Sequence, residues 1–125
     1  MPIALRILAA LPGALFCLIA FQWLLSPGQA ANGLDLPLLS GAARSTQIGD
    51  TGAFFLGIGA FFFLGAIRLE RQWFQAAALL VGGAAFYRIV AWAFHGAPFT
   101  TDKIGVELFT LAIAAFAASR CRGGR

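Results

Sequence analysis

Two charged residues lie inside apolar stretches in the second half of the chain, and their types suit them to chemistry. Arg88 interrupts the apolar stretch 73–94, and Glu107 interrupts the stretch 104–119. Ionisable side chains within membrane-spanning segments are costly, and they usually mark a functional site or a structural pair. A cation and an anion in such positions indicate an ion pair, an anion-binding site or a route for protons.

The spacing of these two residues favours a pair. Arg88 lies six residues before Phe94, or about 9 Å along a helix axis, and Glu107 lies four residues after Lys103, or about 6 Å. A short turn between two antiparallel helices would bring them to similar depth. We therefore expect a direct or water-bridged ion pair just below the outer membrane surface. Their helical faces are small or polar and should point inward; they hold Ala84, Ala85, Ala91, Trp92 and His95 beside Arg88, and Lys103, Thr110, Leu111 and Ala114 beside Glu107.

Other polar residues extend this pair into a predicted outward-facing cluster. The candidate site residues are Arg88, Glu107, His95, Arg44 and Asp50, with Asp102 and Lys103 near them. One interpretation is structural, with the charges locking the last two helices together. The alternatives are a small anionic ligand at Arg88 and His95, or proton or ion movement through Glu107.

The pattern gives little support to an enzyme, and no catalytic residue, metal or cofactor is expected. His95 is the only histidine, which excludes a bis-histidine haem and disfavours zinc. No residues follow the order of a nucleophilic triad. Cys17 and Cys121 are expected at different depths and unpaired. Both are expected to be inert small residues, and the alternative for Cys121, between Arg120 and Arg122, is a reactive thiol.

The composition places the chain in a membrane. Its 125 residues are 60% hydrophobic and only 11% charged, against about 25% charged in an average soluble protein. A soluble domain of this size keeps much of its surface in water and has no room to hide so many apolar side chains. The net charge of +4 comes from residues at the ends of apolar stretches, so a lipid bilayer, and not nucleic acid, is the expected partner.

The hydropathy pattern predicts an all-α fold, a bundle of four transmembrane helices in a single domain, 1–125. The approximate spans are 3–25, 51–69, 73–94 and 104–119, close to the 20 or so residues that a bilayer requires. Stretch 3–25 is also open to interpretation as a signal peptide, because small residues at 28–31 ("GQAA") suit cleavage. The long loop 26–50 either lies on the membrane surface, folds over the bundle or is a plain connector.

The basic residues predict the orientation. They are concentrated on one side of the predicted membrane, which should be cytoplasmic and should hold both termini. Tryptophans near three span ends fit interfacial anchors. The basic residues are Arg6, Arg68, Arg71, Arg120, Arg122 and Arg125, and the tryptophans are Trp23, Trp73 and Trp92.

Small residues predict which helices touch, because helices in lipid associate where backbones approach closely. The second span has two small faces, one with Ala53, Gly57 and Ala60, the other with Gly52, Gly59 and Ala66. It is therefore expected at the centre, between two neighbours. Similar pairs, Ala78 with Gly82 and Ala114 with Ala118, mark contact faces on the third and fourth spans.

Several of these residues give the chain a family resemblance. Arg44 precedes a glycine-rich span, "GDTGAFFLGIGAF"; "YRIVAWAFHGAP" carries Arg88, Gly96 and Pro98; Glu107 follows in the last span. In this the chain resembles a family of small bacterial four-helix membrane proteins, domain of unknown function 4345. The resemblance implies the fold and an inner-membrane location, and it implies no activity.

The sequence therefore favours a non-enzymatic inner-membrane protein, an accessory or scaffold subunit, with a homo-oligomer or another membrane protein as partner. The alternative is a small-solute or proton-coupled transporter or binder that uses Arg88 and Glu107.

Overall fold

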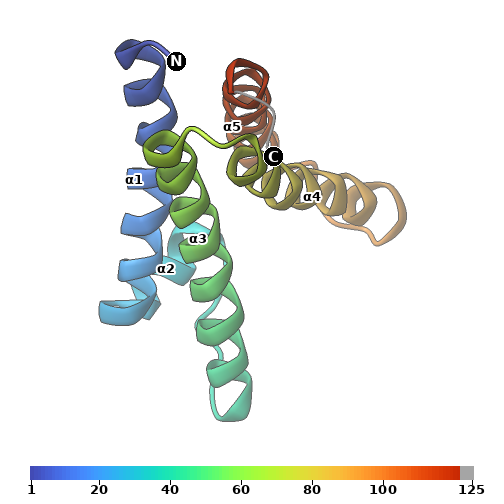
Figure 1. The fold of residues 1–125 in the computed structure, drawn as a ribbon. Helices are drawn as coiled ribbons and strands as arrows, with labels where there is room; N and C mark the ends of the chain where they lie inside the picture. The colour runs from blue at the N-terminus through green and yellow to red at the C-terminus, as the bar shows by residue number, and fades with distance from the viewer. Residues whose placement is uncertain (122–125) are drawn as a thin grey trace.

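Residues 1–121 fold into four long helices and one short one (Figure 1). The computed structural model describes residues 1–121, and within them the elements are α1 (Ile3–Leu25), α2 (Pro27–Gly33), α3 (Ala42–Arg68), α4 (Arg71–Phe94) and α5 (Thr101–Arg120). Helices α1, α3 and α4 are each long and apolar enough to cross a membrane. Helix α5 is less apolar, because four of its 20 residues are charged.

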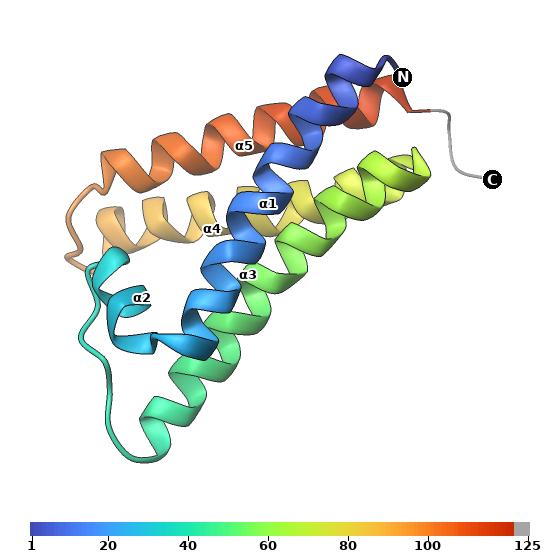
Figure 2. The same cartoon turned by 90° about the vertical axis from the view of Figure 1, so that its left-hand side faces the viewer.

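The long helices form two antiparallel pairs arranged as a wedge. Helix α1 packs against α3, helix α4 packs against α5, and α3 joins the pairs by also contacting α4. Figure 2 shows the pairs close together where α1 begins and α5 ends, and far apart at the other end, where α2 lies between them. We call these the closed end and the open end. The two diverging pairs are a more open arrangement than the expected bundle.

Close backbone approach holds α1 against α3. A Cβ atom added to Gly59 would lie 2.8 Å from the backbone nitrogen of Cys17 and 2.9 Å from the carbonyl oxygen of Gly13. Such distances are too short for any side chain, so only glycine permits this crossing. The predicted small face of the second span thus forms a helix contact, as expected for helices in lipid.

The second small-residue contact of α3 is with α4. Gly65 faces the ring of Phe74, which lies 2.7 Å from the position of an added Cβ. Phe74 also packs edge-on against Phe62, and both rings are fully buried. Gly65 belongs to neither predicted small face, but Gly57, which does, also faces α4, where an added Cβ would lie 3.9 Å from Leu80. Helix α3 therefore contacts both α1 and α4, as its two small faces predict.

Arginine side chains link the helices at the closed end of the wedge. Arg6 of α1 donates to the carbonyl of Ala66 near the end of α3, at 3.0 Å. Arg71 of α4 donates to the carbonyls of Ala118 and Cys121 at the end of α5, at 3.2 and 3.3 Å. The last carbonyls of a helix have no partner within the helix, so each arginine both satisfies them and ties two helices together.

The region 26–50 is not the single long loop that the sequence predicts. Residues 27–33 form α2, in which Pro27 takes the first position, where its missing N–H costs nothing. Helix α3 then begins at Ala42, nine residues before the predicted span. Extending an existing helix costs little because each added residue gains a hydrogen bond. Only residues 34–41 remain as a connection, and Gln47 and Arg44 bind their backbone.

One predicted membrane anchor is wrong. Trp23 is 1% exposed and lies in the core beside α3, so it does not sit at a lipid interface. Its indole ring is large and mostly apolar, so it fills the contact between α1 and α3 instead of lying at the lipid–water interface. Trp73 and Trp92 remain near the ends of α4, as predicted. Arg122 and Arg125, two of the basic residues that predict the orientation, lie outside the described residues.

Candidate functional site

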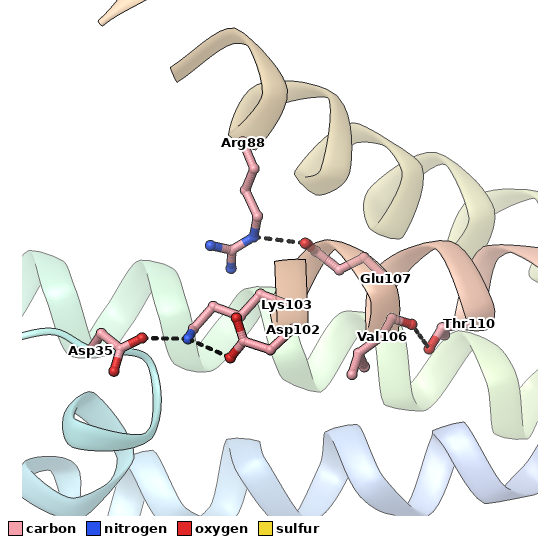
Figure 3. Close-up of polar contacts among 7 residues, drawn as sticks. All are labelled: Asp35, Arg88, Asp102, Lys103, Val106, Glu107 and Thr110. Carbon is pink, nitrogen blue, oxygen red and sulfur yellow. Dashed lines mark hydrogen bonds and ion pairs between the residues drawn. The ribbon is translucent and has the colours of Figure 1, made fainter. Parts of the chain in front are cut away.

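Arg88 and Glu107 face one another across α4 and α5. The Nε of Arg88 donates to Oε1 of Glu107 at 2.6 Å, and the two side chains are 33% and 12% exposed (Figure 3). The turn at 95–100 makes the helices antiparallel, so a position six residues before the end of α4 meets one near the beginning of α5. A guanidinium and a carboxylate at this distance form a charge-assisted hydrogen bond.

The helical face of Glu107 points inward along its whole length. Thr110 and Ala114 on this face are buried, and the hydroxyl of Thr110 donates to the carbonyl of Val106 at 2.8 Å. The face of Arg88 behaves differently. Ala85 is buried, but Trp92, one turn beyond Arg88, is 50% exposed. The expectation that both faces are interior is therefore right for α5 and wrong for the last turns of α4.

Lys103 links two segments of the chain at the open end. Its Nζ donates to Oδ2 of Asp35 at 2.5 Å and to Oδ2 of Asp102 at 3.3 Å (Figure 3). Asp35 follows α2, so this contact ties the segment after α2 to the beginning of α5. The lysine side chain is 12% exposed, whereas both carboxylates are about three-quarters exposed. Lys103 therefore lies under its two acidic partners, and the acids face water.

The charges of Lys103, Asp35 and Asp102 stabilise one another. All three residues precede the expected span 104–119. The hydrogen bond to Asp35 raises the pKa of Lys103 above its ordinary value. The hydrogen bond from Lys103 lowers the pKa of Asp102. Both shifts favour the charged forms at neutral pH, so Lys103 remains a cation whose charge is already matched by two carboxylates.

A cleft separates the two helix pairs, and its polar end carries these groups. It has a volume of about 210 Å³ and a mainly apolar lining. Helices α1, α3, α4 and α5 and the end of α2 all contribute to it. The apolar lining consists of Leu15, Phe16, Ile19, Leu34, Phe54, Phe55, Ile58, Val81 and Val106; the charged lining consists of Arg88, Asp102, Lys103 and Glu107.

Three of the five predicted site residues lie elsewhere. Arg44 and Asp50 are exposed on the first turns of α3, and Arg44 donates to the carbonyl of Leu39 at 2.6 Å. His95 is exposed and ends α4 as its C-cap. None of the three lines the cleft. Arg44 and Asp50 are displaced because the expected loop continues as helix α3, which carries them away along its own axis.

The cysteines are not paired, and neither offers a reactive site. Cys17 is half-buried against α3, and Cys121 is 6% exposed at the end of α5. Burial raises the pKa of the Cys121 thiol, which disfavours the reactive thiolate. Burial therefore favours the expected inert cysteine over the reactive alternative that its flanking arginines offered. Within residues 1–121, no three His, Cys, Asp or Glu side chains come together as metal ligands do.

Asp35 is the site residue that the sequence does not reveal. It stands 68 positions from Lys103, and no local pattern connects them. A weak signal exists at the backbone, because Asp35 has a positive φ of 59°, a conformation that aspartate tolerates better than most residues. That signal marks a turn and does not identify its partner.

Fold and site together define an all-helical protein with at least three helices suited to a membrane and a polar-ended cleft between its two helix pairs. Comparisons with protein-family models, with curated proteins and with solved structures found no match.

Proposed function

We propose that all four long helices cross a bacterial inner membrane and that both termini lie in the cytoplasm. The basic residues support this orientation. Arg6, Arg68, Arg71 and Arg120 lie at the closed end, and Asp35, Asp50 and Asp102 lie on segments of the open end. Positive charge stays on the cytoplasmic side. The pairing of Arg88 with Glu107 removes much of the cost of placing α5 in lipid.

Reporter fusions test whether α5 crosses. Alkaline phosphatase fused after Pro98 should be active, because the enzyme folds only outside the cytoplasm, and fused at the C-terminus it should be inactive. Green fluorescent protein at the same two positions should give the opposite pattern. The same result at both positions would show that α5 does not cross and would refute the four-span topology.

We propose further that the protein binds a small ligand in the cleft. The observation that carries this proposal is the cleft itself, which has a mainly apolar lining and four ionisable side chains at one end. Ligand sites are typically concave, mostly apolar and equipped with few convergent polar groups. The cleft favours this interpretation over that of a scaffold, which requires no interior cavity. Helix α2 and the contact of Asp35 with Lys103 would then cover the cleft at the open end.

A substitution that fills the cleft tests the binding function. Val106 lines the cleft and is 50% exposed, so Val106→Trp should occupy the cavity without disturbing buried packing. Leu108→Trp is the matched control, because Leu108 is 49% exposed on the same helix and does not line the cleft. Binding of ten-carbon amphiphiles carrying a photoreactive diazirine, in phosphatidylcholine nanodiscs, should fall about tenfold in Val106→Trp and remain in Leu108→Trp.

The readout is the yield of cross-linked peptides from the cleft-lining segments, measured by mass spectrometry. Equal labelling of the two tryptophan variants, or no labelling of cleft residues by any amphiphile, would contradict the binding function. The folded state of both variants is checked by size-exclusion chromatography and by thermal unfolding.

A further inference from the structure

The cleft has a charged end and an apolar interior, and the two parts follow one another along the axis of α4. Arg88 and Val81 both line it from α4. Val81 precedes Arg88 by seven residues, so it lies about 10 Å nearer the closed end. Phe16 of α1 and Phe55 of α3 stack on one another in the opposite wall. A ligand in this space meets charge at one end and hydrocarbon along its length.

The guanidinium of Arg88 retains two unused nitrogen atoms. Its Nε donates to Glu107, and within residues 1–121 the terminal nitrogens have no hydrogen-bond acceptor. Figure 3 shows both of them on the side of the guanidinium away from Glu107. The planar fork of an arginine matches two oxygen atoms of a carboxylate or a phosphate. The unused donors therefore favour an anionic oxygen group.

The carboxylates do not offer a comparable site for a cation. Glu107 is bound to Arg88, and Asp35 and Asp102 share the cation of Lys103. The last two are also about three-quarters exposed, so water screens their charge. Although the five charges sum to one negative charge, the acidic excess lies in water and the unsatisfied donors face the cleft.

The volume limits the size of the apolar part. An apolar cavity of about 150 Å³ holds a molecule of six carbons such as benzene. By proportion, the 210 Å³ of this cleft takes a segment of roughly eight carbons. That is one short chain, or the first part of a longer one, and it is less than the two chains of a complete phospholipid require.

We propose that the cleft binds a single-chain amphiphile with an anionic oxygen head group, a carboxylate or a phosphate. The head group is held by the terminal nitrogens of Arg88, and the chain lies against Phe16, Phe55 and Val81. This inference rests on the proposed binding function and names the ligand class for it.

Photoreactive probes of one chain length separate the parts of this proposal. Decanoate and decyl phosphate, each carrying a diazirine, should label the cleft of the full chain in phosphatidylcholine nanodiscs. The matching decanol and decyltrimethylammonium probes, at the same bilayer mole fraction, should label it about tenfold less. An excess of acetate or inorganic phosphate should not displace the anionic probes, because neither supplies a chain.

Two variants assign the selectivity to Arg88. Glu107→Gln removes the competing carboxylate, so labelling by decanoate should increase. The double variant Arg88→Gln with Glu107→Gln keeps an uncharged pair able to form hydrogen bonds. In it labelling by decanoate should fall about tenfold, to the level of decanol. Decanol labelling should be the same in both variants, which also shows that the cleft is intact.

The outcomes separate the two proposals. Equal labelling by all four probes, abolished by Val106→Trp, would overturn the anionic class and leave the binding function standing. Stronger labelling by decyltrimethylammonium would also overturn it. Displacement of the probes by acetate or phosphate would show a site for the ion alone and refute the role of the chain. Absence of cleft labelling by every probe would refute both proposals.

Discussion

Glu107→Ala is expected to destabilise the protein more than Glu107→Ala combined with Arg88→Leu. The single change leaves the guanidinium of Arg88 without its carboxylate, in a site where Glu107 is only 12% exposed. Removing one partner of a buried pair typically costs about 3–5 kcal/mol, whereas replacing both with apolar residues is often close to neutral. Because Arg88 is 33% exposed, we expect a loss near the lower end of that range.

The measurement is the free energy of unfolding in mixed micelles, with sodium dodecyl sulfate as the denaturant. Asp102→Ala is the matched control, because it removes an acid from the same helix at a position that is 77% exposed. It should cost less than about 1 kcal/mol, as exposed pairs do. Losses of equal size in the single and double variants would show that Arg88 and Glu107 do not depend on one another.

The pair itself follows from local geometry, which explains why the sequence was sufficient for it. The rise per residue and a short antiparallel turn fix the relative depth of Arg88 and Glu107. His95 shows the limit of the same reasoning. Helical periodicity assigned it to the face of Arg88, but α4 ends at Phe94, and His95 has ψ of 17° outside the helix. A face that is defined by helical spacing ends where the helix ends.

Features that depend on contacts between distant parts of the chain cannot be predicted from the rise and periodicity of a helix. The bounds of α1 agree with the predicted span 3–25, because a continuous apolar stretch defines both ends. The beginning of α3 was missed by nine residues, since polar residues such as Arg44 and Asp50 are compatible with loop and helix alike. The contact of Lys103 with Asp35 depends on where α2 places the following turn. No periodicity in the sequence encodes that position.

The wedge could not be predicted either, although its main contacts were. Small residues indicate that α3 touches two helices, and of the predicted faces Gly59 lies against α1 and Gly57 faces α4. Gly59 and the unpredicted Gly65 set the distances of closest approach. Other side chains determine how the helices diverge away from those points. The position of α2 between the pairs at the open end is a tertiary property (Figure 2). The cleft, and hence the site, comes from that divergence.

Gly59→Leu is expected to disrupt the α1–α3 pair and with it one wall of the cleft. Even the first atom of the new side chain would lie 2.5 Å from Sγ of Cys17 and 2.8 Å from its backbone nitrogen. Overpacking usually costs about 1–3 kcal/mol where side chains can adjust. Here the obstacle includes backbone, so the helices must separate, and we expect a loss at or above the upper end of that range.

Gly83→Leu is the control for the change of residue type. Gly83 lies inside α4, and a Cβ added there meets nothing within 4 Å. Replacing a helical glycine in open space should be neutral or gain up to about 1 kcal/mol. A second variant, Gly59→Leu with Cys17→Ala, identifies the cause. It removes the sulfur but leaves the nitrogen of Cys17 and the carbonyl of Gly13 in place, so unfolding in mixed micelles should show no recovery. Full recovery would mean that a side chain, and not the backbone approach of two helices, sets the spacing of the pair.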